Sequence, residues 1–197
     1  MSECSTFISS SPTHPGTPGA LGRPQAGRRV AILGEDGAPV PYGEPGTIAV
    51  HRSDPGLMLG YFGAPEETAE RFAGDWFLTG DQGAMAEDGE IRYLGRGDDM
   101  MNAGGYRVSP IEVESALADL PGITEVGVTD VAVKEGVNVI AAFYVAAEPL
   151  DETLLQARAA ERLARYKQPR AYVRVDALPR NANGKLIRKA LKEHVIP

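Results

Sequence analysis

Gly104-Gly105-Tyr106-Arg107-Val108-Ser109-Pro110-Ile111-Glu112 is the stretch that most clearly predicts the fold of the C-terminal half of the chain. Its two glycines indicate a turn. A helix is expected directly afterwards, because Ser109 can act as the N-cap, Pro110 suits the first helical position and Glu112 completes a capping box. The helix should end near Leu120, since a Pro-Gly pair follows.

The residues after this stretch alternate between predicted strands and helices. Runs rich in β-branched residues predict strands over residues 124–128, 137–145 and 172–175. A second helix is expected to begin after the N-cap Asp151. A spacing of 3.6 residues places four of its side chains on one face: Leu155, Ala159, Leu163 and Tyr166. With a terminal helix over residues 186–194, these elements predict a compact α+β unit of about 100 residues, a usual size for a domain.

The N-terminal half has the pattern of an antiparallel β structure. Strands are predicted over residues 29–33, 46–52, 76–86 and 90–94, with Asp88-Gly89 as a hairpin turn between the last two. A short helix is predicted over residues 64–72. Residues 1–28 are expected to form irregular connections, because they are rich in Ser, Thr, Pro and Gly. We place the boundary at Asp98, which gives a β-rich domain over residues 1–97 and an α+β domain over residues 98–197.

The composition excludes several classes of protein. A net charge of -7 over 197 residues argues against general nucleic-acid binding, which needs clustered Lys and Arg. Cys4 is the only cysteine, so an internal disulfide and a Cys-based metal site are both excluded. The longest apolar run, residues 139–147, is far shorter than the ~20 residues of a membrane helix. The N-terminus lacks the features of a signal peptide, which makes a cytoplasmic protein the simplest interpretation. The histidines are scattered and indicate neither a metal site nor a nucleophile: His14, His51 and His194.

Lys185 lies in a motif near the C-terminus, where residues 179–188 read Pro-Arg-Asn-Ala-Asn-Gly-Lys-Leu-Ile-Arg. This is not a phosphate-binding P-loop, which requires Gly at the first position and Ser or Thr after the lysine. Taken alone, Lys185 would be interpreted as a solvated loop lysine. Two further motifs are equally ambiguous by themselves. In Thr79-Gly80-Asp81 the aspartate could be a turn residue, and in Gly95-Arg96-Gly97-Asp98 both charged residues could be solvated.

Taken together, and in their order along the chain, the four motifs resemble the C-terminal portion of the adenylate-forming superfamily. This superfamily comprises acyl-CoA synthetases, peptide-synthetase adenylation domains and luciferases. The resemblance covers essentially the whole chain. It implies an enzyme that joins a carboxylic acid to ATP as an acyl-adenylate and then transfers the acyl group to CoA, with ATP, Mg²⁺ and CoA as cofactors or co-substrates. It also implies a small antiparallel β subdomain followed by a mobile α+β lid.

The resemblance assigns roles to individual residues. Lys185 would bridge the substrate carboxylate and the α-phosphate of ATP, where a mobile cation stabilises two approaching anions. Three residues would bind the nucleotide: Asp81, Arg96 and Arg107. The pantetheine chain of CoA would pass the loop formed by Gly104, Gly105 and Tyr106. Asp98 would be the hinge about which the lid rotates between the half-reactions, and Glu3 would help to hold Mg²⁺.

The resemblance also indicates what this chain lacks. The family's phosphate loop and acyl pocket would lie upstream of every residue present, so we expect a truncated portion that does not adenylate an acid alone. The face left without its neighbour should favour self-association. The sequence Gly-Gly-Tyr-Arg-Val-Ser-Pro at residues 104–110 resembles a CoA ligase more than a peptide-synthetase domain. The alternatives are a peptide-synthetase-type adenylation domain and a non-catalytic fragment or interaction module that retains the fold.

Overall fold

The computed structural model describes residues 1–103, 105–134 and 137–193. The chain divides into two compact units, Met1–Asp98 (unit 1) and Asp99–Pro197 (unit 2), and each is described by itself. Within the described residues, no helix combines the length and apolar character needed to cross a membrane.

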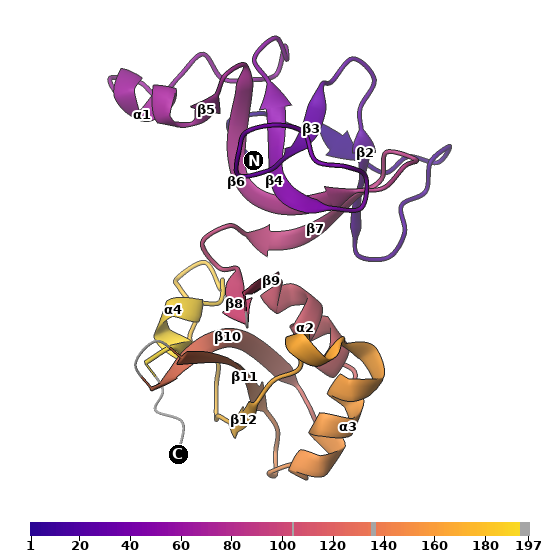
Figure 1. Ribbon diagram of the computed structural model, residues 1–197, viewed down its shortest axis with the longest axis vertical. Helices are drawn as coiled ribbons and strands as arrows, with labels where there is room; N and C mark the ends of the chain where they lie inside the picture. The colour runs from indigo at the N-terminus through magenta and orange to yellow at the C-terminus, as the bar shows by residue number, and fades with distance from the viewer. Residues whose placement is uncertain (104, 135–136, 194–197) are drawn as a thin grey trace. The chain divides into compact units, whose positions relative to one another are not determined.

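Unit 1 is built on one antiparallel sheet of seven strands with the order β1-β2-β7-β6-β4-β3, and β5 pairs with β6 outside this path (Figure 1). The strands are β1 (Ile8–Ser9), β2 (Ala20–Pro24), β3 (Val30–Leu33), β4 (Pro45–His51), β5 (Phe72–Ala73), β6 (Trp76–Met85) and β7 (Ile91–Arg96). The short helix α1 (Pro65–Glu70) has Pro65 in its first turn and two glutamates near its positive end. The predicted β3, β4, β6 and β7 strands are therefore confirmed to within two residues at each end.

The expectation that residues 1–28 are irregular is wrong, because β1 and β2 form there. β1 pairs with β2 through Ile8↔Pro24, and β2 pairs with β7. Gly22 permits this arrangement, since it has a φ of +102° and an added Cβ would lie 2.3 Å from the carbonyl carbon of Ser9. These strands depend on pairing with distant residues, which a local sequence pattern does not reveal.

Cys4 is completely buried in unit 1 against Val50 and Phe77. Burial raises the pKa of its thiol to about 11, and the nearby carboxylates add to the effect. Because the thiolate is the reactive form, we expect Ellman's reagent at pH 8 to modify the native chain about 100-fold more slowly than the urea-unfolded chain. Equal rates in the two states would contradict the buried position of this residue.

Unit 2 has a three-stranded sheet in which β10 (Glu125–Lys134) is antiparallel to β11 (Val137–Val145) and β12 (Ala171–Arg174) is parallel to β11. A second, two-stranded sheet joins β8 (Met101–Ala103) to β9 (Tyr106–Val108). The helices are α2 (Pro110–Leu117), α3 (Glu152–Arg162), the 3-10 helix η1 (Arg165–Lys167) and α4 (Arg188–Leu191). The predicted α+β class is confirmed.

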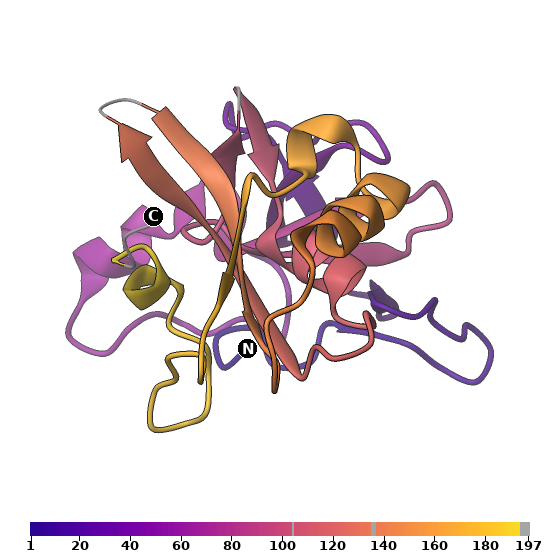
Figure 2. The same ribbon diagram turned by 90° about the horizontal axis from the view of Figure 1, so that it is seen from below.

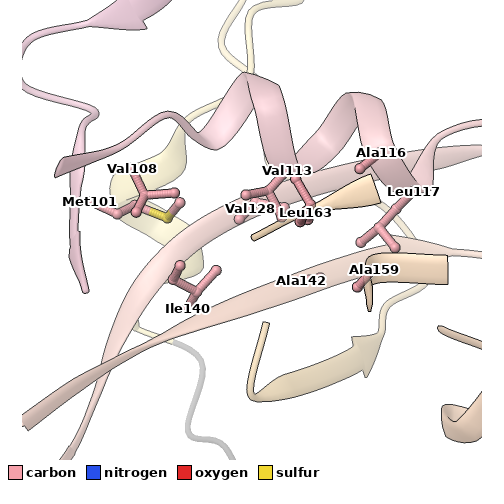
Figure 3. Packing of buried hydrophobic residues seen from close by; sticks show 10 residues of the cluster. All are labelled: Met101, Val108, Val113, Ala116, Leu117, Val128, Ile140, Ala142, Ala159 and Leu163. Atoms are coloured by element: carbon pink, nitrogen blue, oxygen red, sulfur yellow. The ribbon is translucent and has the colours of Figure 1, made fainter. Parts of the chain in front are cut away.

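Alternate residues of β11 pack on opposite faces of the larger sheet. Ile140 and Ala142 face α2 and α3, in the cluster drawn in Figure 3. Ala141 and Phe143 face the opposite side, where they pack with Leu191 of α4. Figure 2 accordingly shows α2 and α3 on one side of the β10–β11 pair and α4 on the other. The sheet is thus covered on both faces, and the segment that contains Lys185 belongs to the α4 side.

Two helix predictions in unit 2 need correction. The helix capped by Asp151 ends at Arg162, and Leu163 has extended backbone angles, φ −125° and ψ 138°. Leu163 is still buried, but Tyr166 belongs to η1 rather than to the inner face of α3. The terminal helix covers only Arg188–Leu191. His194, the expected last residue of that helix, lies outside the described residues.

Candidate active-site residues

Asp81 and Arg96 face each other on neighbouring strands of unit 1. They are register partners on β6 and β7, and an Arg96 Nη1 atom lies 3.3 Å from Oδ1 of Asp81. The same guanidinium donates to the carbonyl of Thr79, and its Nε is 3.5 Å from Oδ1 of Asp98. Partial burial lowers the pKa of Arg96, but the two carboxylates outweigh this effect and raise it. The structure therefore brings three of the predicted residues together as one charged cluster.

The Asp81 cluster is suited to hydroxyl recognition. The side chain of Asp81 is 26% exposed, so its carboxylate is accessible while Arg96 fixes its orientation. A carboxylate can accept hydrogen bonds from two hydroxyl groups, as on a ribose. Gly80 allows the guanidinium to approach, because it has a φ of +78° and an added Cβ would lie 2.9 Å from Arg96 Nη2.

Glu3 lies in a polar setting that keeps its carboxylate ionised. Tyr61 donates its hydroxyl to Oε1 at 3.3 Å, and Ser2 donates to Oε2 at 2.9 Å. Hydrogen bonds from the backbone and from Ser2 lower the pKa of Glu3. No group of three His, Cys, Asp or Glu residues is placed to hold a metal ion in the part of the chain that the structure describes. Mg²⁺ is commonly bound through one or two carboxylates together with substrate phosphates, so Glu3 fits as a single ligand.

Lys185 is exposed at the end of a tight hairpin in unit 2. The N–H of Asn181 donates to the carbonyl of Lys185 at 2.9 Å, and the Asn181 side chain accepts from the N–H of Lys185 at 2.9 Å. Arg180 donates to the carbonyl of Gly184 and pairs with Glu125 on β10 at 2.5 Å. Gly184 itself has a φ of +77°, which a glycine adopts without strain. The hairpin therefore presents a cation from a backbone that is fixed on both sides.

The β8–β9 turn carries the residues predicted to line the CoA path. Gly104 lies outside the described residues, and Gly105 has a φ of +86°. Tyr106 is 59% exposed, and its ring lies against the ring of Tyr166, with the centroids 4.6 Å apart and the planes at 33°. Arg107 is exposed on β9, opposite Asn102.

A cavity of about 250 Å³ opens beside this aromatic pair. It is lined by Ala103, Tyr106, Asn138, Val139, Ile140, Tyr166, Gln168 and Arg170. Lys167, between the lining residues Tyr166 and Gln168, attaches this segment to α2, since its Nζ lies 2.6 and 2.8 Å from the carboxylate oxygens of Glu112. Three of these residues were not predicted from the sequence as site residues: Tyr166, Gln168 and Arg170. The Pro that follows Gln168 was the only signal that the helix had ended before them.

Comparisons with known proteins place this geometry in a family. Residues 112–185 match the AMP-binding enzyme C-terminal domain. The chain is 42% identical over 177 residues to a 2-succinylbenzoate–CoA ligase of Geobacillus kaustophilus, covering 88% of this chain and 35% of that protein. It is 36% identical over 200 residues to a sulfoacetate–CoA ligase of Cupriavidus necator, covering 98% and 38%. The ATP-bound structure of MatB from Rhodopseudomonas palustris matches 98% of this chain and 39% of its own, with a TM-score of 0.87 and 32% identity.

The fold and these matches define the class, which is the C-terminal portion of an adenylate-forming enzyme. The chain belongs to the adenylate-forming superfamily, as its motifs predicted. It spans about a third of the length of the curated relatives that it matches.

Proposed function

We propose that this chain is the C-terminal portion of an ATP-dependent acyl-CoA synthetase and that unit 2 is its mobile lid. The reaction would proceed from a carboxylic acid and ATP to an acyl-adenylate and pyrophosphate, after which the thiol of CoA displaces AMP. The observation that carries the proposal is the exposed Lys185, held on a braced hairpin in a chain whose relatives include CoA ligases.

The adenylation half-reaction needs a cation where two anions meet. The substrate carboxylate attacks the α-phosphate, so negative charge gathers in the transition state. Lys185 supports this step because its ammonium group is accessible while Asn181 fixes its own backbone and Arg180 fixes the carbonyl of the preceding Gly184. In unit 1, Asp81 and Arg96 would offer an acceptor and a donor to the ribose and phosphates of a nucleotide. Glu3 would hold Mg²⁺, which neutralises phosphate charge when it is bound.

The thioester half-reaction needs a path for CoA, and the β8–β9 turn supports one. Gly105 has no side chain, and a Cβ built there would meet no atom of the described residues within 4 Å. The stacked rings of Tyr106 and Tyr166 offer an aromatic surface, and Arg170 in the same cavity can bind a phosphate. These groups suit the adenine nucleotide and thin pantetheine arm of CoA.

A chimera would test this proposal. The matched segment of the Geobacillus kaustophilus 2-succinylbenzoate–CoA ligase would be replaced by this chain, with the rest of that ligase retained. We expect ATP-, CoA- and 2-succinylbenzoate-dependent release of AMP, and no release from the retained part alone. A well-folded chimera without either half-reaction would favour a non-catalytic module.

Gly105→Leu should separate the two half-reactions in this chimera. The leucine side chain would extend into the proposed CoA path, so thioester formation from supplied acyl-AMP should fall by about 10²-fold or more, while ATP–pyrophosphate exchange changes little. Gly89→Leu is the matched control. Gly89 also has a positive φ, +85°, and open space around it, so it carries the same backbone strain at a turn of unit 1. An equal loss of thioester formation in both variants would show that strain alone is responsible.

A further inference from the structure

Arg188, three residues after Lys185, contacts two acidic side chains of unit 2 that lie 74 and 89 residues earlier in the chain. Its Nη2 atom donates to the carboxylate oxygens of Glu114 at 2.7 and 2.8 Å, and its Nη1 atom lies 3.4 Å from Oδ2 of Asp99. The side chains of Arg188 and Glu114 are only 12% and 16% exposed. A planar guanidinium can hold two carboxylates in fixed directions, which the point charge of a lysine cannot do.

Glu114 fixes this arrangement to the body of unit 2. It lies on α2, and its Oε1 atom also accepts the backbone N–H of Val128 on β10 at 2.9 Å. Partial desolvation raises the pKa of Glu114, whereas Arg188 and the Val128 N–H act in the opposite direction. A carboxylate in this position needs its guanidinium partner, because an unpaired buried charge is strongly unfavourable.

The Lys185 hairpin joins directly onto the Arg188 contact. The N–H of Ile187 donates to the carbonyl of Pro179 at 2.9 Å, which closes the base of the hairpin. Leu186 packs against the cluster that contains Leu191. A change in the position of Arg188 would therefore reach Lys185 through only two residues, Leu186 and Ile187.

The second carboxylate held by Arg188 is the first residue of unit 2. Asp98, the last residue of unit 1, pairs with Arg96 within that unit, and Asp99 pairs with Arg188 within unit 2. Each of the two adjacent aspartates is thus tied to its own unit by an arginine.

We propose that Arg188 is a positioning residue that ties both the Lys185 hairpin and Asp99 to Glu114, so that the catalytic lysine and the C-terminal side of the hinge move as one rigid body. The proposal rests on the proposed function, since it deepens the role given there to Lys185 and adds the hinge that the sequence predicts at Asp98. It confines the pivot to the Asp98–Asp99 linkage and makes the position of Lys185 depend on the same guanidinium.

Hydrogen exchange on the 197-residue chain tests the connection without any substrate. Arg188→Lys keeps a positive charge beside Glu114 but lacks the planar guanidinium that can bind two carboxylates at once. We expect the amides of Gly184, Lys185 and Ile187 to exchange about 10-fold faster than in wild type, with the β10–β11 amides unchanged. Unchanged hairpin exchange, or an equal acceleration throughout unit 2, would overturn the proposal.

Two further variants make the exchange experiment specific. Arg162→Lys is the matched control, because Arg162 pairs with Asp119 at 2.8 Å elsewhere in unit 2 and should leave the hairpin amides at wild-type rates. Asp99→Asn removes the hinge-side contact and keeps the Arg188–Glu114 pair. It should accelerate exchange at residues 99–101 and spare the hairpin. Acceleration of the hairpin by Arg162→Lys, or no local effect of Asp99→Asn, would count against the proposal.

The chimera supplies a readout that a purely structural role would not produce. Arg188→Lys should lower kcat for ATP–pyrophosphate exchange about 10-fold, leave KM for ATP within about two-fold, and preserve thioester formation from supplied acyl-AMP. A loss expressed only in KM, or an equal loss in both half-reactions, would overturn the positioning role. A wild-type chimera that lacks both half-reactions would refute the proposed function instead, and the exchange rates would then decide the connection by themselves.

Discussion

Lys185→Ala is expected to reduce ATP–pyrophosphate exchange by the chimera by about 10²–10³-fold. The variant removes the cation that, in the proposed function, meets the attacking carboxylate and the α-phosphate. The hairpin backbone should survive, because its hydrogen bonds to Asn181 and Arg180 use the main chain rather than the lysine side chain. Thioester formation from supplied acyl-AMP should stay within about three-fold of wild type, since that step no longer joins two anions at phosphorus.

Lys189→Ala provides the matched control for this prediction. Lys189 is another exposed lysine, in the first turn of α4, and it lies four residues from Lys185. Its removal changes the net charge by the same amount and should leave both half-reactions near wild type. Equal loss of both half-reactions in Lys185→Ala, or a similar loss in Lys189→Ala, would show that Lys185 has no specific role in adenylation.

Arg28→Met should destabilise unit 1 by about 3–5 kcal/mol, because it leaves the Asp54 carboxylate buried without its partner. The Asp54 side chain is 0% exposed and receives its charge-paired hydrogen bond from Arg28. The N–H of Gly56 donates to the same Asp54 oxygen at 2.8 Å, so the carboxylate cannot turn out to water without losing a second bond.

Urea unfolding followed by tryptophan fluorescence measures this effect. Trp76 is the only tryptophan and lies on β6, so its emission reports on unit 1. Arg52→Met is the control. Arg52 pairs with Asp75 at 3.3 Å, but both side chains are more than half exposed. Arg52→Met should therefore lower the free energy of unfolding by less than about 1 kcal/mol. Similar midpoints for Arg28→Met and wild type would contradict the assignment of Asp54 as a buried, charge-dependent group.

Local patterns in the sequence predict much of the fold. The bounds of β11 agree with the predicted strand at residues 137–145, because a long run of β-branched and apolar residues has one interpretation. Ser109 caps α2 by accepting the N–H of Glu112, as the Ser-Pro-Ile-Glu sequence indicates. The carboxylate of Glu112, however, pairs with Lys167. That pair joins residues 55 positions apart, and the local sequence pattern does not predict it.

The features that escaped prediction depend on long-range contacts. β1 and β2 form because distant strands pair with them, although their own composition favours turns. Tyr166 has the spacing of an inner helical face, yet α3 ends before it and the ring turns to Tyr106 instead. Arg188 stands in a recognisable motif, but its partner Glu114 lies 74 residues earlier. Motifs therefore locate the candidate residues, whereas the contacts that orient them follow only from the three-dimensional structure.

A rapid-quench measurement on the chimera tests the central claim most directly. Enzyme in excess over 2-succinylbenzoate would be mixed with ATP and Mg²⁺, and CoA would be added after a delay. We predict that acyl-AMP accumulates first and is converted to the CoA thioester only after CoA arrives, while the retained part of the ligase alone forms no thioester. A folded chimera that forms no more acyl-AMP or thioester than the retained part would contradict the assignment of this chain as the C-terminal portion of an acyl-CoA synthetase.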